Sequence, residues 1–120
     1  MTRISVFIVD DHTLFRTGLR GLLVSRNLDV VGMTGYPEEA VELLQQSRPD
    51  IVLLDLRMRE LGGLELLRQI RVVLPDQTVV ILTTSVDEND LIEALRLGAD
   101  GYLLKAVSYT HLTLPTICSV

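Results

Sequence analysis

The stretch Pro49-Asp50-Ile51-Val52-Leu53-Leu54-Asp55-Leu56-Arg57-Met58 organises the rest of the chain. Four consecutive aliphatic residues run directly into the carboxylate of Asp55. A continuous apolar run of this length is typical of a parallel strand buried on both faces. Ligands in an open α/β sheet bind outside the carboxyl ends of such strands. We therefore expect Asp55 to lie in a ligand-binding cleft.

Short apolar runs and segments with helical spacing alternate along the chain. They predict strands at residues 4–9, 29–34, 51–54, 79–82 and 101–104, and helices at residues 14–23, 37–44, 64–74 and 87–97. The strand at 29–34 is the least apolar and is expected at a sheet edge. The β-α alternation, with its fifth helix missing, predicts an α/β fold with a three-layer, doubly wound parallel sheet.

Local signals mark several element boundaries. Pro37 is expected at the first position of its helix, with acidic residues in the first turn. Gly98 is well placed to end a helix in a left-handed conformation. Gly62 and Gly63 are interpreted as a flexible link between the central strand and the next helix.

Composition limits the class of protein. The chain has 120 residues, of which 48% are hydrophobic, enough for one compact domain. Its net charge of −5 argues against direct binding of nucleic acid or an anionic membrane. Cys118 is the only cysteine, so one chain can form neither a disulfide framework nor a thiolate metal site. No membrane-length apolar run or signal-peptide pattern is present, and we expect a cytoplasmic protein.

The last fifteen residues do not fit the alternating design. Residues 106–120 carry no Asp, Glu, Lys or Arg, and residues 107–116 resemble a sequencing adapter translated in one frame. We therefore predict a domain at residues 1–105 that stops before its last helix, followed by a non-native tail at residues 106–120. Without that helix, the first helix alone would cover one face of the sheet.

Carboxylates follow two strands that should be neighbours. The first and third strands of such a sheet flank the topological switch point, which brings Asp10, Asp11 and Asp55 together. Three clustered carboxylates raise one another's pKa unless a cation neutralises them. Oxygen ligands in an exposed cleft suit Mg²⁺. A single strand-end acid would be only a solvated cap, but the three together favour a metal site.

Two further strand ends carry chemistry. Thr83 closes the fourth strand with a hydroxyl, and Lys105 closes the fifth with an ammonium group. Lys105 is the only lysine among 11 basic residues, which suggests a need for a compact point charge. A cation, a hydroxyl, an ammonium and a nucleophilic carboxylate are the components of phosphoryl transfer.

This ordered set of residues resembles the receiver domain of bacterial response regulators. The matching positions, over residues 3–105, are Asp10-Asp11, Asp55, Thr83, Gly98-Ala99-Asp100-Gly101-Tyr102 and Lys105. The segment Asp10-Asp11-His12-Thr13-Leu14-Phe15-Arg16 is similar to the NarL/FixJ group, whose receivers precede a LuxR-type helix-turn-helix. The resemblance implies the CheY-like strand order 2-1-3-4-5 and transcription regulation.

The resemblance also implies roles for individual residues. Asp55 would accept a phosphoryl group from a sensor histidine kinase or a small phosphodonor. Asp11, Asp55 and the backbone carbonyl of Arg57 would bind Mg²⁺ directly, with Asp10 acting largely through water. Lys105 and Thr83 would bind phosphoryl oxygens. With these residues the domain would catalyse only its own phosphorylation and dephosphorylation. It would not otherwise be an enzyme.

Activation would move Thr83 inward, and the ring of Tyr102 would follow. Tyr102 could equally be an ordinary half-buried strand aromatic. The fourth helix and fifth strand would then present a changed face, on which a homodimer could form. DNA would be reached only through a missing C-terminal domain.

His12 is expected to lead into the first helix near the site, without a ligand role.

Three rival functions share parts of this pattern. A flavodoxin-like electron carrier shares the strand order, but Asp10 and Asp11 would repel an FMN phosphate. An aspartate-nucleophile phosphatase of the haloacid dehalogenase type needs a second Asp two residues after the nucleophile, where this chain has Arg57. A degenerate receiver that acts only as a protein-interaction module is disfavoured because every expected site residue is present.

Overall fold

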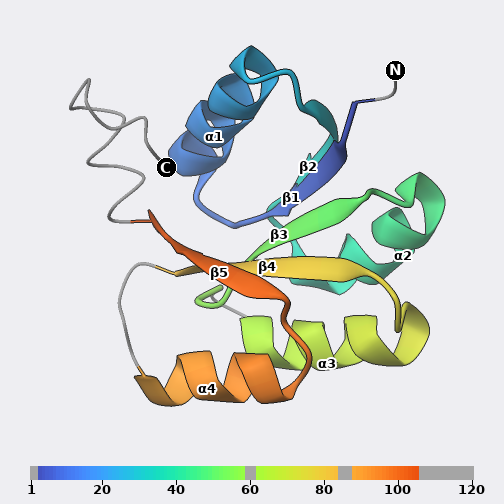
Figure 1. Ribbon diagram of the computed structural model, residues 1–120, viewed down its shortest axis with the longest axis vertical. Helices are drawn as coiled ribbons and strands as arrows, with labels where there is room; N and C mark the ends of the chain where they lie inside the picture. Colours follow the sequence, from blue (N-terminus) through green and yellow to red (C-terminus); the bar gives the residue numbers. More distant parts are fainter. Residues whose placement is uncertain (1–2, 59–61, 84–87, 106–120) are drawn as a thin grey trace.

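A parallel five-stranded sheet lies at the centre of the molecule, with helices on both faces (Figure 1). The computed structural model describes residues 3–58, 62–83 and 88–105. The strands are β1 (Ser5–Val9), β2 (Asp29–Thr34), β3 (Ile51–Asp55), β4 (Thr78–Thr83) and β5 (Gly101–Leu104). The helices are α1 (Thr13–Ser25), α2 (Pro37–Ser47), α3 (Gly63–Val73) and α4 (Glu88–Arg96). The non-native tail predicted at residues 106–120 lies outside the described residues.

The sheet confirms the predicted topology. Its strand order is β2-β1-β3-β4-β5, and every neighbouring pair is parallel. The least apolar strand, β2, lies at the edge as predicted. Strand β3 lies in the middle, and its residues from Val52 to Asp55 are buried, as its continuous apolar run indicates.

The two faces of the sheet are covered unequally. On one face, α2, α3 and α4 pack against the sheet around a core that includes Leu44, Leu66, Ile70 and Ala94. On the other face, the described part of the chain contributes only α1, through Leu19 and neighbours (Figure 1).

Helix boundaries follow the predicted local signals. Pro37 occupies the first position of α2, where its missing N–H leaves no hydrogen bond unmade. Gly98 has a positive φ of 100°, and its N–H donates to Leu95 while the N–H of Ala99 donates to Ala94. These two bonds form a Schellman motif and satisfy the last carbonyls of α4. Asp87, at the predicted start of this helix, lies outside the described residues.

The interpretation of Gly62 and Gly63 as a flexible link is wrong for Gly63. Gly63 is the buried first residue of α3, and its N–H donates to the carbonyl of Leu56 at 3.0 Å. A Cβ atom at Gly63 would collide with the carbonyl oxygen of Asp55 and with backbone atoms of Leu56. The glycine therefore lets α3 begin directly against the end of β3.

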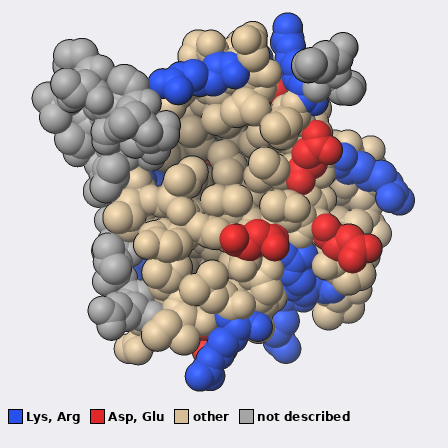
Figure 2. Space-filling view, in the orientation of Figure 1, with Lys and Arg blue, Asp and Glu red and all other residues tan. Residues whose placement is uncertain are grey.

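Acidic and basic side chains lie scattered around a broad uncharged area on the face seen in Figure 2. That face therefore does not present the continuous basic stripe typical of nucleic-acid binding. Within residues 3–58, 62–83 and 88–105, we find no helix with the length and apolar character needed to span a bilayer.

Candidate functional site

The carboxyl ends of β1 and β3 meet at the topological switch point of the sheet. Val9 pairs with Leu54 across the two strands, so Asp10 and Asp55 follow at adjacent positions of the ladder. Their exposures are 0% for Asp10 and 1% for Asp55. The backbone N–H of Asp10 donates to the carbonyl of Thr34 at 3.0 Å, which fixes the loop that follows β1. The sheet therefore holds two buried carboxylates side by side.

The environment of Asp55 disfavours its charge. Burial is the largest cause and raises the pKa of Asp55, and the charge of Asp10 raises it further. The backbone N–H of Arg57, which donates to Asp55 Oδ1 at 3.0 Å, acts in the opposite direction, as do Lys105 and His12. The upward shift expected from clustered acids is thus present at Asp55, although burial is its main cause.

Lys105 provides the cationic part of the site from the end of β5. Its Nζ lies 2.8 Å from Asp10 Oδ2 and 3.6 Å from Asp55 Oδ2. The same atom lies 4.4 Å from the centroid of the Phe15 ring, within range of a cation–π interaction. Lys105 is almost fully buried, so these contacts determine where its charge lies.

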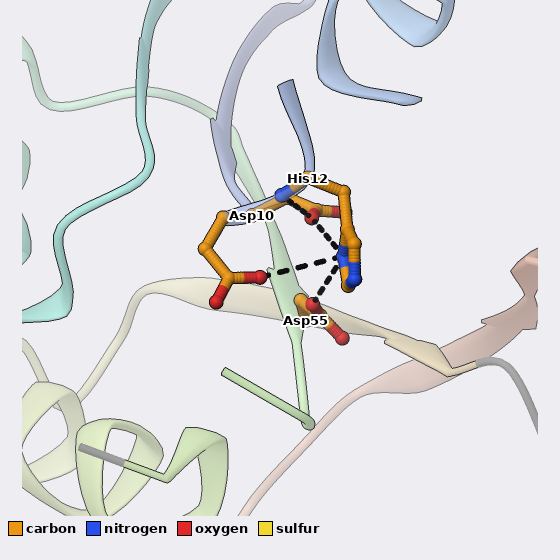
Figure 3. A group of neighbouring side chains, drawn as sticks. Asp10, His12 and Asp55 are labelled. Atoms are coloured by element: carbon orange, nitrogen blue, oxygen red, sulfur yellow. Dashed lines mark hydrogen bonds and ion pairs between the residues drawn. The ribbon is translucent and has the colours of Figure 1, made fainter. Parts of the chain in front are cut away.

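His12 lies further into the site than its sequence position suggests. It is the N-cap residue of α1, as expected for a residue that leads into this helix. Its imidazole points between the carboxylates of Asp10 and Asp55 (Figure 3). Nδ1 of His12 lies 3.1 Å from Asp10 Oδ1, 3.3 Å from Asp11 Oδ1 and 3.5 Å from Asp55 Oδ2. It also lies 3.1 Å from Lys105 Nζ.

The remaining predicted residues lie at or near the carboxyl ends of neighbouring strands. Thr83 is buried at the end of β4, one residue after Leu82, the partner of Asp55 in the ladder. Arg57 follows Asp55 at the mouth of the site, and its guanidinium lies 3.3 Å from Asp90 Oδ2. Tyr102 is half-exposed on β5, at the ladder position that pairs with Ile81.

The clustered side chains fit a divalent cation. One ligand atom from each of Asp10, Asp11, His12 and Asp55 can be chosen so that all four atoms lie within 4.8 Å of one another. Asp55 Oδ2 is buried and has no hydrogen-bond donor among the described residues. A cation at the cluster would satisfy this oxygen and offset the cost of burying the charge.

Sequence reasoning missed the contacts of His12 and Phe15. His12 directly follows the two aspartates, so its proximity was expected, but the direction of its ring depends on the N-cap conformation. Phe15 follows the apolar spacing of α1, which indicates a core residue and gives no sign of Lys105. The aspartates, Thr83 and Lys105 were identifiable because each ends a strand.

Comparison with known proteins gives a consistent result. Residues 6–114 match the response regulator receiver domain family. The chain is 38% identical over 102 residues to the nitrate/nitrite response regulator protein NarL of Escherichia coli K12, covering 84% of this chain and 47% of NarL. It is 43% identical over 105 residues to the transcriptional regulatory protein YdfI of Bacillus subtilis, covering 86% of this chain and 48% of YdfI. The chain thus spans about half the length of the curated relatives it matches.

A solved structure supports the same assignment. A two-component response regulator of the LuxR family from Aurantimonas sp. SI85-9A1 superposes with a TM-score of 0.84 at 31% identity, over 93% of this chain and 81% of that one. Receiver domains are regulatory, are phosphorylated by sensor histidine kinases, and bind Mg²⁺ at an acidic pocket. The strand order, the acidic cluster and the family match agree, and this chain belongs to the response regulator receiver domain family.

Proposed function

We propose that Asp55 is the phosphoacceptor of this domain. A carboxylate oxygen of Asp55 attacks the phosphorus of a kinase phosphohistidine, the P–N bond breaks, and an aspartyl phosphate forms. A small phosphodonor reacts in the same way through its own leaving group. The observation that carries this proposal is the position of Asp55, buried beside Asp10 and 3.6 Å from Lys105.

Mg²⁺ is the cofactor that these residues would hold. Asp11, Asp55 and the backbone carbonyl of Arg57 are its proposed direct ligands, with Asp10 acting through water. When bound, Mg²⁺ would neutralise charge on the carboxylates and on the incoming phosphoryl oxygens. The support is the acidic cluster and the buried Asp55 Oδ2, which has no hydrogen-bond donor among the described residues.

Lys105 and Thr83 are the proposed partners of the bound phosphoryl group. Lys105 Nζ already lies near Asp55, and Thr83 ends the neighbouring strand. If the Thr83 hydroxyl moves toward the phosphoryl group, it would shift the domain between two conformations, and the ring of Tyr102 would follow Thr83. The α4–β5 face would then change and control homodimerisation and a DNA-binding output domain beyond this chain.

Two alternatives remain testable. A degenerate receiver would bind partners through the same fold without accepting phosphate. An aspartate-nucleophile phosphatase would turn over phosphate esters, but it needs a general acid two residues after Asp55, where Arg57 stands. Stoichiometric modification without turnover supports the assignment of Asp55 as the phosphoacceptor.

The division of the chain into residues 1–105 and a tail at 106–120 also stays a prediction.

Intact-mass measurement tests the proposal. Acetyl phosphate with Mg²⁺ should add one phosphoryl group to the wild-type chain, and a chelator should abolish the addition. Asp55→Asn should prevent it, whereas Asp76→Asn, a control in the exposed turn before β4, should not. An adduct that persists in Asp55→Asn would refute the assignment.

A further inference from the structure

Arg16 on α1 is a half-buried cation beside the acidic site that the proposed function does not use. It lies one turn after the N-cap residue His12, and its backbone N–H donates to the carbonyl of His12 at 2.9 Å. Its Nη1 donates to the backbone carbonyl of Asp10 at 2.5 Å. A hydrogen bond from a charged guanidinium is stronger than one between neutral groups. The side chain therefore links α1 firmly to the end of β1.

The carbonyl that Arg16 holds belongs to the peptide between Asp10 and Asp11. The backbone N–H and both carboxylate oxygens of Asp10 have other partners, which are Thr34, His12 and Lys105. The Arg16 bond differs from these contacts because it acts on the peptide from which Asp11 continues. A peptide is planar, so fixing its carbonyl also fixes the N–H of Asp11 and limits where the Asp11 side chain can lie.

Gly35, in the turn between β2 and α2, leaves the space that the guanidinium of Arg16 occupies. Thr34 is the ladder partner of Val9, so this turn lies beside the loop that follows β1. A Cβ atom at Gly35 would lie 2.6 Å from Nη1 of Arg16, closer than two such atoms can approach. The φ of Gly35 is outside the left-handed region, so alanine could adopt the same backbone. An added methyl group would therefore displace the guanidinium and leave its charge in the protein.

We propose that Arg16 is a positioning residue for the Asp10–Asp11 pair, and that glycine at position 35 is required for this role. The inference rests on the proposed function, in which Asp11 is a direct ligand of Mg²⁺. Asp11 offers an oxygen within 4.8 Å of ligand atoms of Asp10 and Asp55. The hydrogen bond from Arg16 keeps the backbone of Asp11 in the position that makes this approach possible.

The charge and the hydrogen bond of Arg16 have opposite effects on a cation site. A positive charge near the acidic pair repels Mg²⁺, so removing the charge alone would strengthen Mg²⁺ binding. Removing a group that orients a metal ligand weakens binding, by about 10–100-fold in metal sites. The direction of the change in Mg²⁺ affinity after Arg16→Met therefore separates positioning from a purely electrostatic contribution.

Amide hydrogen exchange in the presence of a chelator tests the backbone part of the proposal without any metal. The N–H of Asp10, which donates to Thr34, should exchange about tenfold faster in Arg16→Met and in Gly35→Ala than in wild type, because the loop has lost one restraint. The amides of β1 are the internal reference. An equal increase at Asp10 and throughout β1 would show that Arg16 only stabilises the fold, and would overturn the proposal.

Calorimetric titration with Mg²⁺ gives the second readout. Arg16→Met and Gly35→Ala should each weaken Mg²⁺ binding about tenfold, and the double variant should bind within about twofold of either one, because both changes remove the same hydrogen bond. Arg20→Met, at an exposed position one turn further along α1, is the control for the loss of charge. Gly21→Ala, where a Cβ atom would meet no atom within 4 Å, is the control for the added methyl group. Both controls should bind Mg²⁺ as wild type does.

The outcomes separate this inference from the proposed function. Unchanged or tighter Mg²⁺ binding by Arg16→Met would overturn the positioning role, and so would additive losses from Arg16→Met and Gly35→Ala. A wild-type chain that takes no phosphoryl group from acetyl phosphate would instead count against Asp55 as the phosphoacceptor. The exchange rate of the Asp10 amide would still decide the role of Arg16 in that case, because it is measured without metal or phosphodonor.

Discussion

Asp55 is almost completely buried, and its carboxylate has few compensating partners. Burial raises the pKa of Asp55, so the folded state binds a proton at this residue more tightly than the unfolded chain does. Its contribution to stability is therefore fully present at low pH and is lost as pH rises through the folded-state pKa. The residue that the proposed chemistry requires is thus a source of instability at neutral pH.

Asp55→Asn should make the metal-free domain more stable than wild type at pH 7, because the amide carries no charge to bury. The difference should vanish below about pH 4, where the wild-type carboxylate is protonated in the unfolded chain as well. Urea unfolding in the presence of a chelator, repeated across this pH range, measures the effect. Asp76→Asn in the exposed turn is the control, and equal stability of Asp55→Asn and wild type at pH 7 would contradict the prediction.

Phe15 is expected to position the ammonium of Lys105. Replacing the ring with leucine retains an apolar side chain but removes the face that lies 4.4 Å from Nζ. Phe15→Leu and Lys105→Met should show a coupling free energy of about 0.5–1 kcal/mol in a double-mutant cycle of urea unfolding. Additive effects of the two changes would show that the ring contributes only packing.

At the scale of single elements, α3 depends on contacts at both of its ends. Its first residue lies against the backbone that carries Asp55, and Arg71 in its last turn reaches the end of α4. The helix therefore links the loop beside the site to the connection between α4 and β5. Two substitutions test the two ends separately.

Gly63→Ala should destabilise the domain by about 1–3 kcal/mol, because the added Cβ would collide with backbone that cannot rotate away. Gly62→Ala is the matched control. No atom lies within 4 Å of a Cβ built at Gly62, the N-cap residue of α3, and we expect a cost of about 1 kcal/mol or less there. Chemical denaturation of both variants checks the prediction, which would be wrong if the two changes cost the same.

Arg71 joins three segments through its guanidinium group. Nη2 donates to the carbonyl of Gly98 at 2.7 Å and Nη1 donates to that of Gln77 at 2.6 Å, while Asp100 Oδ2 lies 3.1 Å from Nη2. Arg71→Ala should therefore lower the free energy of unfolding by about 2–3 kcal/mol. The exposed Arg68, which pairs with Glu65 on the same helix face, supplies the control substitution Arg68→Ala.

Thermal unfolding followed by circular dichroism distinguishes the two arginine variants. We expect a clearly lower midpoint for Arg71→Ala and a midpoint close to wild type for Arg68→Ala. A midpoint for Arg71→Ala that matches wild type would mean that water replaces its hydrogen bonds without cost.

At the scale of the whole molecule, the site joins the ends of separate strands. Asp10 follows β1 and Asp55 ends β3, so a cation bound there restrains two strands that are far apart in the chain. Such binding requires the folded chain, because these residues are not adjacent in the unfolded state. Cation binding should therefore raise the free energy of unfolding of the whole domain.

Mg²⁺ at ten times its dissociation constant should stabilise the domain by about 1.4 kcal/mol. The midpoint of thermal unfolding should rise with Mg²⁺ concentration and return to its starting value after addition of a chelator. Asp11→Asn should weaken the response, because it removes a proposed ligand from a partly buried position. A midpoint that is independent of Mg²⁺ in the wild-type chain would count against the proposed site.

The sequence by itself determined the order of elements, the parallel sheet and the strand-end residues of the site. Buried parallel strands require continuous apolar runs, and a polar residue that ends such a run must emerge at the carboxyl edge of the sheet. Asp10, Asp55, Thr83 and Lys105 were identifiable for this reason. The edge position of β2 followed from its weaker apolar pattern.

Only the tertiary structure decided the contacts between segments that lie far apart in the chain. His12 reaches Lys105 across 93 residues of sequence, and the ring of Phe15 lies against the same lysine. The role of Gly63 also depends on how closely α3 approaches the backbone of β3. Periodicity reports which face of an element is apolar, but side-chain direction and distance of approach arise only when the elements pack together.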